Sequence, residues 1–211
     1  MESIVPSQKA ANSVIVLDFE TTGLSPNQGD RAIEIGAVKL VDGKVVDSFQ
    51  KLMNPGFRVS GFIEGYTGIS NRMLATADSC EVVMNHFADF IQGSNLVAHN
   101  ASFDKRFLDA ELALIGRQYD GEFACSLLNS RRLTQQAASH KLGDLVRLHN
   151  IDNDGVFHRA LADAQVTASL WLVHLDILKQ EFGIESPEFS LMQKIGKTPK
   201  GSVAKMLSKI G

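Results

Sequence analysis

The sequence predicts a single α/β domain, built as a mixed β-sheet with helices on its faces. The first observation is the order of the apolar runs. Three short runs come first, and runs with helical spacing then alternate with further short runs. The second observation is length, because 211 residues suffice for one substantial domain and are too few for two ordinary domains and a linker.

Short apolar runs give the candidate strands: residues 13–19, 32–41, 44–53 and 95–99, with 121–125 as a candidate last strand. Asp42-Gly43 lies between the second and third of these runs and is typical of a tight hairpin turn. The second and third strands are therefore expected to form a hairpin.

Helical spacing marks three longer stretches. Residues 78–92 place on one face Val82, Val83, Phe87, Phe90 and Ile91. A second helix is expected to end at Gly116. Its inner face would be formed by Phe103, Phe107, Leu108, Leu112 and Leu114. The longest pattern covers residues 159–182, with an inner face formed by Leu161, Ala168, Leu172, Leu175 and Leu178. Strands alternating with such helices favour the mixed sheet.

Charge is unevenly distributed along the chain. The formal net charge is −3, yet residues 191–211 hold five lysines and no acid, so that removing this +5 leaves −8 for residues 1–190. A negative body argues against a protein that coats duplexes electrostatically. It is compatible with an enzyme that binds the end of a single nucleic-acid strand through metal ions.

The expected compartment is the cytoplasm. No apolar run approaches the length of a membrane-spanning helix, and the polar start of the chain does not resemble a signal peptide. Cys80 and Cys125 stand far apart without metal-ligand spacing, so we expect two reduced thiols.

Two acids close the first strand. Asp18 and Glu20 are two residues apart, so their side chains point to the same face of a strand, with Phe19 on the other. Neighbouring carboxylates repel each other unless a cation lies between them, and hard divalent cations prefer oxygen ligands. Taken alone, the pair fits two solvated loop acids equally well.

A third acid, Asp104, follows the strand at residues 95–99 and lies in the first turn of the next helix. A carboxylate there also favours the positive end of the helix, so a purely capping role is the alternative. Asn100 is a further candidate N-cap.

His158 and Asp163 precede and begin the longest helix. Five helical residues turn the chain through about 500°, which would leave the two side chains ~140° apart on one regular helix. They converge only if His158 lies in the preceding loop, where Gly155 leaves room. The alternative for His158 is an ordinary surface histidine.

As a set, these residues predict phosphodiester chemistry. Four carboxylates can jointly hold two divalent cations about 3.5–4 Å apart. A histidine, with an unperturbed pKa of about 6.5, can accept a proton from water near neutral pH.

At these residues the sequence resembles the DnaQ-like DEDDh 3′→5′ exonucleases, the family that includes the epsilon proofreading subunit of bacterial DNA polymerase III. The matching segments, in family order and spacing, are D-F-E-T-T-G-L at 18–24, G-D-R-A-I-E-I-G-A-V at 29–38, H-N-A-S-F-D at 99–104 and H-R-A-L-A-D at 158–163. Together they span residues 13 to about 182.

The resemblance implies a ribonuclease-H-like fold with a five-stranded mixed sheet flanked by helices. It implies that two Mg²⁺ or Mn²⁺ ions are bound by Asp18, Glu20, Asp104 and Asp163. His158 would be the general base. The backbone near Thr21, with Leu24 as a wedge, would hold the 3′-terminal nucleotide. Structural roles are implied for His99, Asn100 and Glu34.

The expected organisation is an extension at residues 1–12, an exonuclease domain at 13–185 and a basic tail at 186–211. A helix capped by Ser202 is expected in the tail, with an apolar face formed by Val203, Met206, Leu207 and Ile210. It either packs on the domain or contacts nucleic acid or a partner protein. The tail does not match the polymerase-binding segment of the epsilon subunit, which leaves a dedicated proofreading role open.

The predicted activity is release of 5′-mononucleotides from single-stranded or frayed DNA 3′ ends, in proofreading or repair. One alternative is an exoribonuclease resembling oligoribonuclease or ribonuclease T, because the sequence does not show whether a 2′-OH is admitted. Another is a non-catalytic module that binds nucleic acid or a polymerase. Retention of every metal ligand favours the enzyme.

Overall fold

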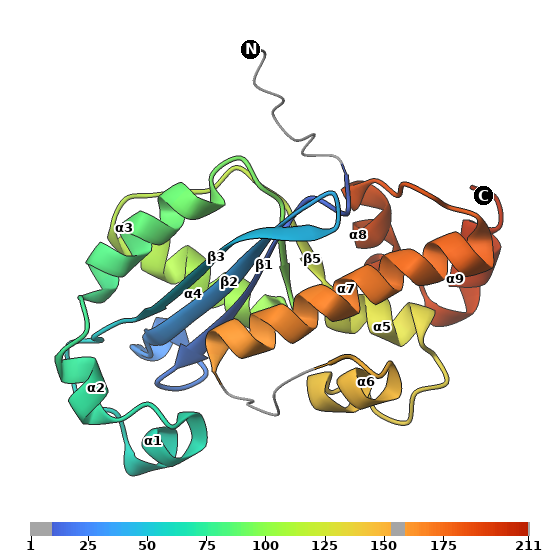
Figure 1. Ribbon diagram of the computed structural model, residues 1–211. Helices are drawn as coiled ribbons and strands as arrows, with labels where there is room; N and C mark the ends of the chain where they lie inside the picture. The colour runs from blue at the N-terminus through green and yellow to red at the C-terminus, as the bar shows by residue number, and fades with distance from the viewer. Residues whose placement is uncertain (1–9, 153–158, 211) are drawn as a thin grey trace.

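The computed structural model describes residues 10–152 and 159–210 and confirms the mixed sheet (Figure 1). The order of the five strands is β3-β2-β1-β4-β5. Their bounds are β1 Ile15–Thr21, β2 Ala32–Val41, β3 Lys44–Leu52, β4 Leu96–Ala98 and β5 Phe123–Cys125. β1 pairs antiparallel with β2 and parallel with β4, which places it at the centre of the sheet.

The hairpin between β2 and β3 is where the sequence predicts it. Asp42 and Gly43 have φ angles of 50° and 74°, the left-handed values that a two-residue hairpin turn needs at both positions. Asp tolerates this region better than most residues, and Gly carries no penalty there.

Helices cover both faces of this sheet (Figure 1). Their bounds are η1 Pro26–Gln28, α1 Gly61–Thr67, α2 Asn71–Ala75, α3 Cys80–Ile91, α4 Ser102–Leu114, α5 Ser126–Leu133, α6 Leu142–Leu148, α7 Ala160–Phe182, α8 Phe189–Lys197 and α9 Lys200–Leu207. The three predicted helical stretches correspond to α3, α4 and α7.

Side chains of β1 alternate between two hydrophobic cores. Ile15, Leu17 and Phe19 are buried with residues of α3 and α4. Val16 is buried on the other face with residues of α7, α8 and α9. Because strand side chains alternate with period two, Asp18 and Glu20 lie on the α7 side. The prediction that they share the face opposite Phe19 is confirmed.

Several local expectations are wrong. Val82 and Leu114 are 44% and 63% exposed and do not belong to the inner faces of α3 and α4. Asn100 is not the N-cap of α4, since Ala101 holds that place and Asn100 adopts a left-handed φ of 72°. Ser202 lies inside α9, whose N-cap is Pro199. The sequence reasoning also missed α1 and α2.

The segment after residue 186 packs on the rest of the fold. Five of its side chains are buried in the core on the α7 face, Phe189, Met192, Ile195, Val203 and Leu207. Arg132 Nε donates to the carbonyl of Thr198 at 3.1 Å, which adds a polar contact between α5 and the tail. None of the described helices is long and apolar enough to cross a membrane.

Candidate active site

The site begins at the carboxyl end of β1. In the ladder with β2, Asp18 lies opposite Gly36 and Glu20 lies opposite Glu34. The first turn of α7 passes directly over Gly36, where a Cβ would overlap the backbone of Ala160 and Leu161. A glycine at this position therefore lets α7 descend onto the strand that neighbours the two acids.

This close approach brings a third carboxylate to the strand. Asp163 lies in the first turn of α7, and one ligand oxygen each from Asp18, Glu20 and Asp163 lie within 4.8 Å of one another. Glu20 and Asp163 are each 8% exposed. Three carboxylates from β1 and α7 thus converge as the sequence predicts.

Asp104 reaches the same strand from α4. It lies in the first turn of α4, is 2% exposed, and accepts a hydrogen bond from the backbone N–H of Phe19 at 3.2 Å. This bond holds Asp104 against the residue between Asp18 and Glu20. Its role is therefore more than a local cap of its own helix.

Crowding and burial oppose ionisation of these acids. Burial, followed by the charges of Asp104, Asp163 and Glu20, raises the pKa of Asp18 well above its ordinary value. Burial and the neighbouring acids raise the pKa of Glu20 to about 8. Burial raises the pKa of Asp104 to about 7, while the N–H of Phe19 acts in the opposite direction.

Such a cluster fits divalent cations. All its donors are carboxylate oxygens, the ligands that hard cations prefer, and the three converging acids are within chelating reach of one ion. The mutual repulsion that raises the pKa values of these acids would be relieved by a bound positive charge.

The loop after β1 is held by its own hydrogen bonds. The Thr21 hydroxyl donates to the carbonyl of Gly23 at 2.6 Å. Asp30 accepts from the N–H of Ser25 at 2.9 Å, and Gly23 packs directly on the Asp30 carboxylate. Leu24 projects from this ordered loop and is 73% exposed, so it is free to contact a ligand.

Two histidines, His158 and His99, were also singled out from the sequence. His158 lies outside the described residues, so its place relative to the carboxylates stays a prediction. His99 contacts the Ser126 hydroxyl at 2.8 Å through Nδ1 and the His140 carbonyl at 3.0 Å through Nε2. These contacts agree with the structural role expected for His99.

An exposed aromatic pair escaped the sequence reasoning. Phe62 and Tyr66 of α1 are 75% and 53% exposed, and their rings stack with centroids 5.9 Å apart. Ile63 of the same helix packs on a small core with Ile33 and Leu52, at the end of the sheet that carries the acids. The missed signal was the spacing of two aromatics four residues apart after Ser60, the N-cap of α1.

Comparison with known proteins decides the family. The model of an exonuclease family, RNase T, matches residues 15–171. The chain belongs to this exonuclease family. The prediction made from the four motifs is thereby confirmed.

Relatives of this exonuclease domain occur in longer proteins. The PolC-type DNA polymerase III of Caldanaerobacter subterraneus subsp. tengcongensis is 40% identical over 172 residues, which are 82% of this chain and 12% of that protein. The 3′-5′ exonuclease DinG of Bacillus subtilis is 36% identical over 79% of this chain and 18% of its own length. A DNA polymerase III subunit epsilon-like protein of Rhodobacter capsulatus is 38% identical over 78% of this chain and 24% of its own length. The chain thus spans between about an eighth and a quarter of these relatives.

Solved structures agree on the fold. Exonuclease X, in complex with 5′ overhanging duplex DNA, aligns with a TM-score of 0.66 at 28% identity, covering 87% of this chain and 99% of its own. The nuclease domain of 3′hExo, a DEDDh family member bound to rAMP, aligns with a TM-score of 0.67 at 20% identity, covering 84% and 96%. The ribonuclease-H-like prediction is confirmed.

Proposed function

We propose that this protein is a 3′→5′ exonuclease that releases 5′-mononucleotides from single-stranded or frayed DNA ends with two Mg²⁺ or Mn²⁺ ions. The observation that carries the proposal is the convergence of ligand oxygens from Asp18, Glu20 and Asp163 within 4.8 Å of one another. Asp104 joins them by its hydrogen bond to the backbone N–H of Phe19 on β1. Membership of the exonuclease family supports the reaction class.

The four carboxylates would hold the cations. When bound, two divalent cations stabilise the charge on the phosphate and on the departing oxygen and make water more acidic. His158 would accept the proton of the attacking water. The protein itself would hold the carboxylate oxygens close together in a partly buried site, where electrostatic interactions are stronger than in water.

The surroundings of the site suit a single strand. Leu24 would press against the terminal nucleotide, and the backbone near Thr21 would hold it. The stacked rings of Phe62 and Tyr66 offer exposed aromatic faces at the same end of the sheet. Base–aromatic stacking is tolerant of sequence and typical of single-strand binding.

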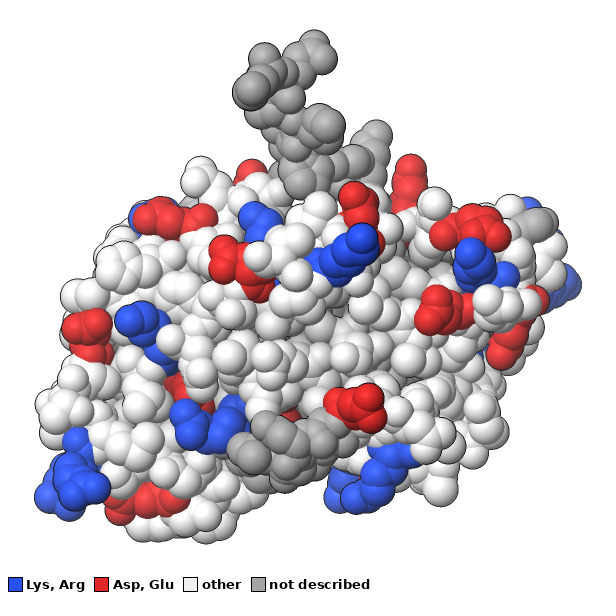
Figure 2. All heavy atoms as spheres, in the orientation of Figure 1, with Lys and Arg blue, Asp and Glu red and all other residues white. Residues whose placement is uncertain are grey.

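The surface charge agrees with binding of a strand end. Figure 2 shows Lys and Arg interspersed with Asp and Glu on the visible face, with a broad uncharged area between them. The formal charge of residues 1–190 is −8 once the five tail lysines are removed from the total of −3. A strand end held through cations needs no extended basic face.

The partners that we propose are DNA 3′ ends, with RNA as the alternative substrate, and a DNA polymerase as a candidate protein partner in replication or repair. The relatives named as DNA polymerase III components support the last of these. We propose a cytoplasmic location, in agreement with the free thiols of Cys80 and Cys125.

A direct test is digestion of end-labelled single-stranded, paired and mismatched DNA, and of matched RNA, with Mg²⁺ present. We expect single nucleotides to leave the 3′ end, faster from single strands and mismatches than from paired ends. Faster cleavage of RNA would favour the exoribonuclease. Binding without cleavage, in Mg²⁺ and in Mn²⁺, would favour the non-catalytic module.

A further inference from the structure

Glu34 is a fully buried carboxylate of β2 whose oxygens are bound by protein donors. They accept hydrogen bonds from Arg159 Nε at 3.1 Å, Arg159 Nη2 at 2.9 Å and the backbone N–H of Ala160 at 3.1 Å. Gln50 Nε2 adds a fourth at 2.9 Å. Glu34 is 0% exposed, and a buried carboxylate is tolerated when its oxygens are satisfied in this way.

The donors belong to the start of α7. Ala160 is the first residue of α7, and Arg159, at the N-cap position, makes no side-chain capping bond. The first N–H groups of a helix have no partner within the helix, and a negative charge is stabilising there. Glu34 therefore supplies from β2 the cap that the sequence of α7 lacks.

The same face of β2 holds α7 at two points. Glu34 binds the N–H of Ala160, and Gly36, two residues later, lets the backbone of Ala160 and Leu161 lie on the strand. These two β2 residues are the direct partners of Glu20 and Asp18 in the β1–β2 ladder. The anchoring points of α7 thus lie beside the acids with which α7 must align Asp163.

We propose that Glu34 is a positioning residue, which anchors the first turn of α7 to β2 and thereby sets the distance of the Asp163 carboxylate from those of Asp18 and Glu20. The backbone carries this influence over one turn, since the N–H of Asp163 donates to the carbonyl of Arg159 at 3.1 Å. The inference rests on the proposed function, because it concerns the cation affinity and turnover of the same site.

Glu111 provides a matched control. It is 2% exposed and accepts from Arg31 Nε and Arg31 Nη2, both at 2.9 Å, and from the backbone N–H of Ala32 at 3.0 Å. The two glutamates therefore have similar environments, since each accepts two hydrogen bonds from one arginine and one from the backbone N–H of the next residue. Glu34 differs in accepting a further bond from Gln50. Glu111, however, joins α4 to the start of β2, and none of these three bonds involves α7.

The experiment compares Glu34→Gln with Glu111→Gln. Each exchange places an amide NH₂ against an arginine, so both variants should lose stability. Only Glu34→Gln should weaken Mn²⁺ binding, measured without nucleic acid by calorimetry or electron paramagnetic resonance, by about 10–100-fold, the range for partners that orient metal ligands. Its kcat should fall while KM changes less, and Glu111→Gln should keep Mn²⁺ affinity within about twofold.

A double variant separates positioning from stability. In Glu34→Gln with Arg159→Gln, no arginine is left facing an amide, and the melting temperature should return toward that of the wild type. The Mn²⁺ affinity should stay low, because the anchor of α7 is still weakened. Recovery of Mn²⁺ affinity together with stability, or wild-type Mn²⁺ affinity in Glu34→Gln, would overturn the proposal. A wild-type protein that binds Mn²⁺ and cleaves nothing would instead refute the proposed exonuclease.

Discussion

At the scale of single residues, the acids of the site are held in an arrangement that is unfavourable without cations. Burial raises the pKa values of Asp18, Glu20 and Asp104, and repulsion by neighbouring acids raises those of Asp18 and Glu20 further. Function at this scale depends on charge more than on packing. Substitutions that keep the shape of these side chains and remove the charge are therefore the most informative.

Asp163→Asn should lower kcat by about three orders of magnitude, because several kcal/mol of charge stabilisation at the phosphate depend on the bound cations. Asp18→Asn should behave alike. Melting temperatures measured in EDTA should be unchanged or higher, since each substitution relieves repulsion. Near-normal turnover in either variant, with Mg²⁺ present, would remove that residue from the ligand set.

His158→Ala should lose about 10²–10⁴-fold in rate, the usual contribution of a general base. A base must be neutral to accept a proton, so the wild-type rate should rise with pH, and the variant should lose this rising limb. Mn²⁺ binding should survive, which distinguishes a base from a ligand. A variant with the rate and pH profile of the wild type would leave His158 as a surface residue.

His174 gives a pH prediction that does not involve the site. It is 0% exposed on α7, its Nε2 lies 2.9 Å from the Ser130 hydroxyl, and burial lowers its pKa from 6.5 to about 3. The unfolded chain then binds the proton more readily than the folded chain. The stabilisation is present above pH 6.5 and is lost as the pH falls below it, by about 2 kcal/mol at pH 5.

Urea unfolding of the wild type and of His174→Leu, measured between pH 8 and pH 5, tests this sign. The difference in unfolding free energy between the two proteins should shrink or reverse toward pH 5, because only the wild type loses the His174 contribution. His86→Gln is the control, since His86 is exposed. A difference that stays constant with pH would contradict the prediction.

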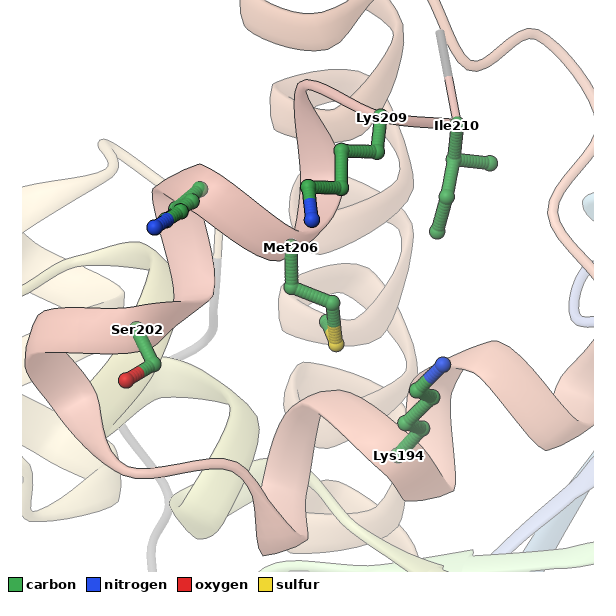
Figure 3. A pocket seen from close by; sticks show the side chains of 6 residues that line it. Lys194, Ser202, Met206, Lys209 and Ile210 are labelled. Carbon is green, nitrogen blue, oxygen red and sulfur yellow. The ribbon is translucent and has the colours of Figure 1, made fainter.

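At the scale of elements, α8 and α9 have one buried side and one basic side. Met192 and Leu207 are buried against the body, while the five tail lysines are exposed. Figure 3 shows Lys194 of α8 and Lys209 after α9 on opposite sides of a cavity of about 400 Å³, with Met206 between them. This cavity shares no residue with the acidic cluster, so these lysines are expected to affect binding without affecting chemistry.

The triple substitution Lys194→Gln, Lys205→Gln, Lys209→Gln should flatten the salt dependence of single-stranded DNA binding, by about 0.7 in slope for each phosphate that a lysine no longer neutralises. The kcat and the melting temperature should hardly change, since the three side chains are exposed and distinct from the ligand set. An unchanged slope would exclude binding of these lysines to phosphates and leave a protein partner as the alternative.

At the scale of the whole molecule, the site is a product of topology. β1 is the central strand, α4 follows its parallel neighbour β4, and α7 crosses β2 at Gly36. Three segments far apart in the chain therefore deliver carboxylates to one end of one strand. A ligand that binds all of them should stabilise the folded molecule as a whole.

Mn²⁺ at 100 times its dissociation constant should stabilise the wild-type protein by about 2.7 kcal/mol, because it binds only the folded form. The melting temperature should rise by several degrees on addition of Mn²⁺ and fall again with EDTA. Asp18→Asn combined with Asp163→Asn should show no such rise. Equal stabilisation of this double variant would place the cation elsewhere.

The sequence by itself determined the class of the fold and predicted the residues of the candidate site. The period-two alternation of β1 predicted that Asp18 and Glu20 share a face, and Asp42-Gly43 predicted the hairpin, since both properties depend on neighbouring residues alone. Motif order predicted the family. Local pattern also misled, because Val82 and Leu114 fit helical spacing and yet lie beyond the edge of their cores.

Only the tertiary structure decided how the acids meet. A sequence cannot show that Gly36 is the point where α7 rests, or that Glu34 on β2 caps α7 at Ala160, because both contacts join segments more than 120 residues apart. The same holds for the hydrogen bond between Asp104 and the N–H of Phe19. Local preference gives each residue its place within an element, whereas long-range packing sets the distances between elements on which cation binding depends.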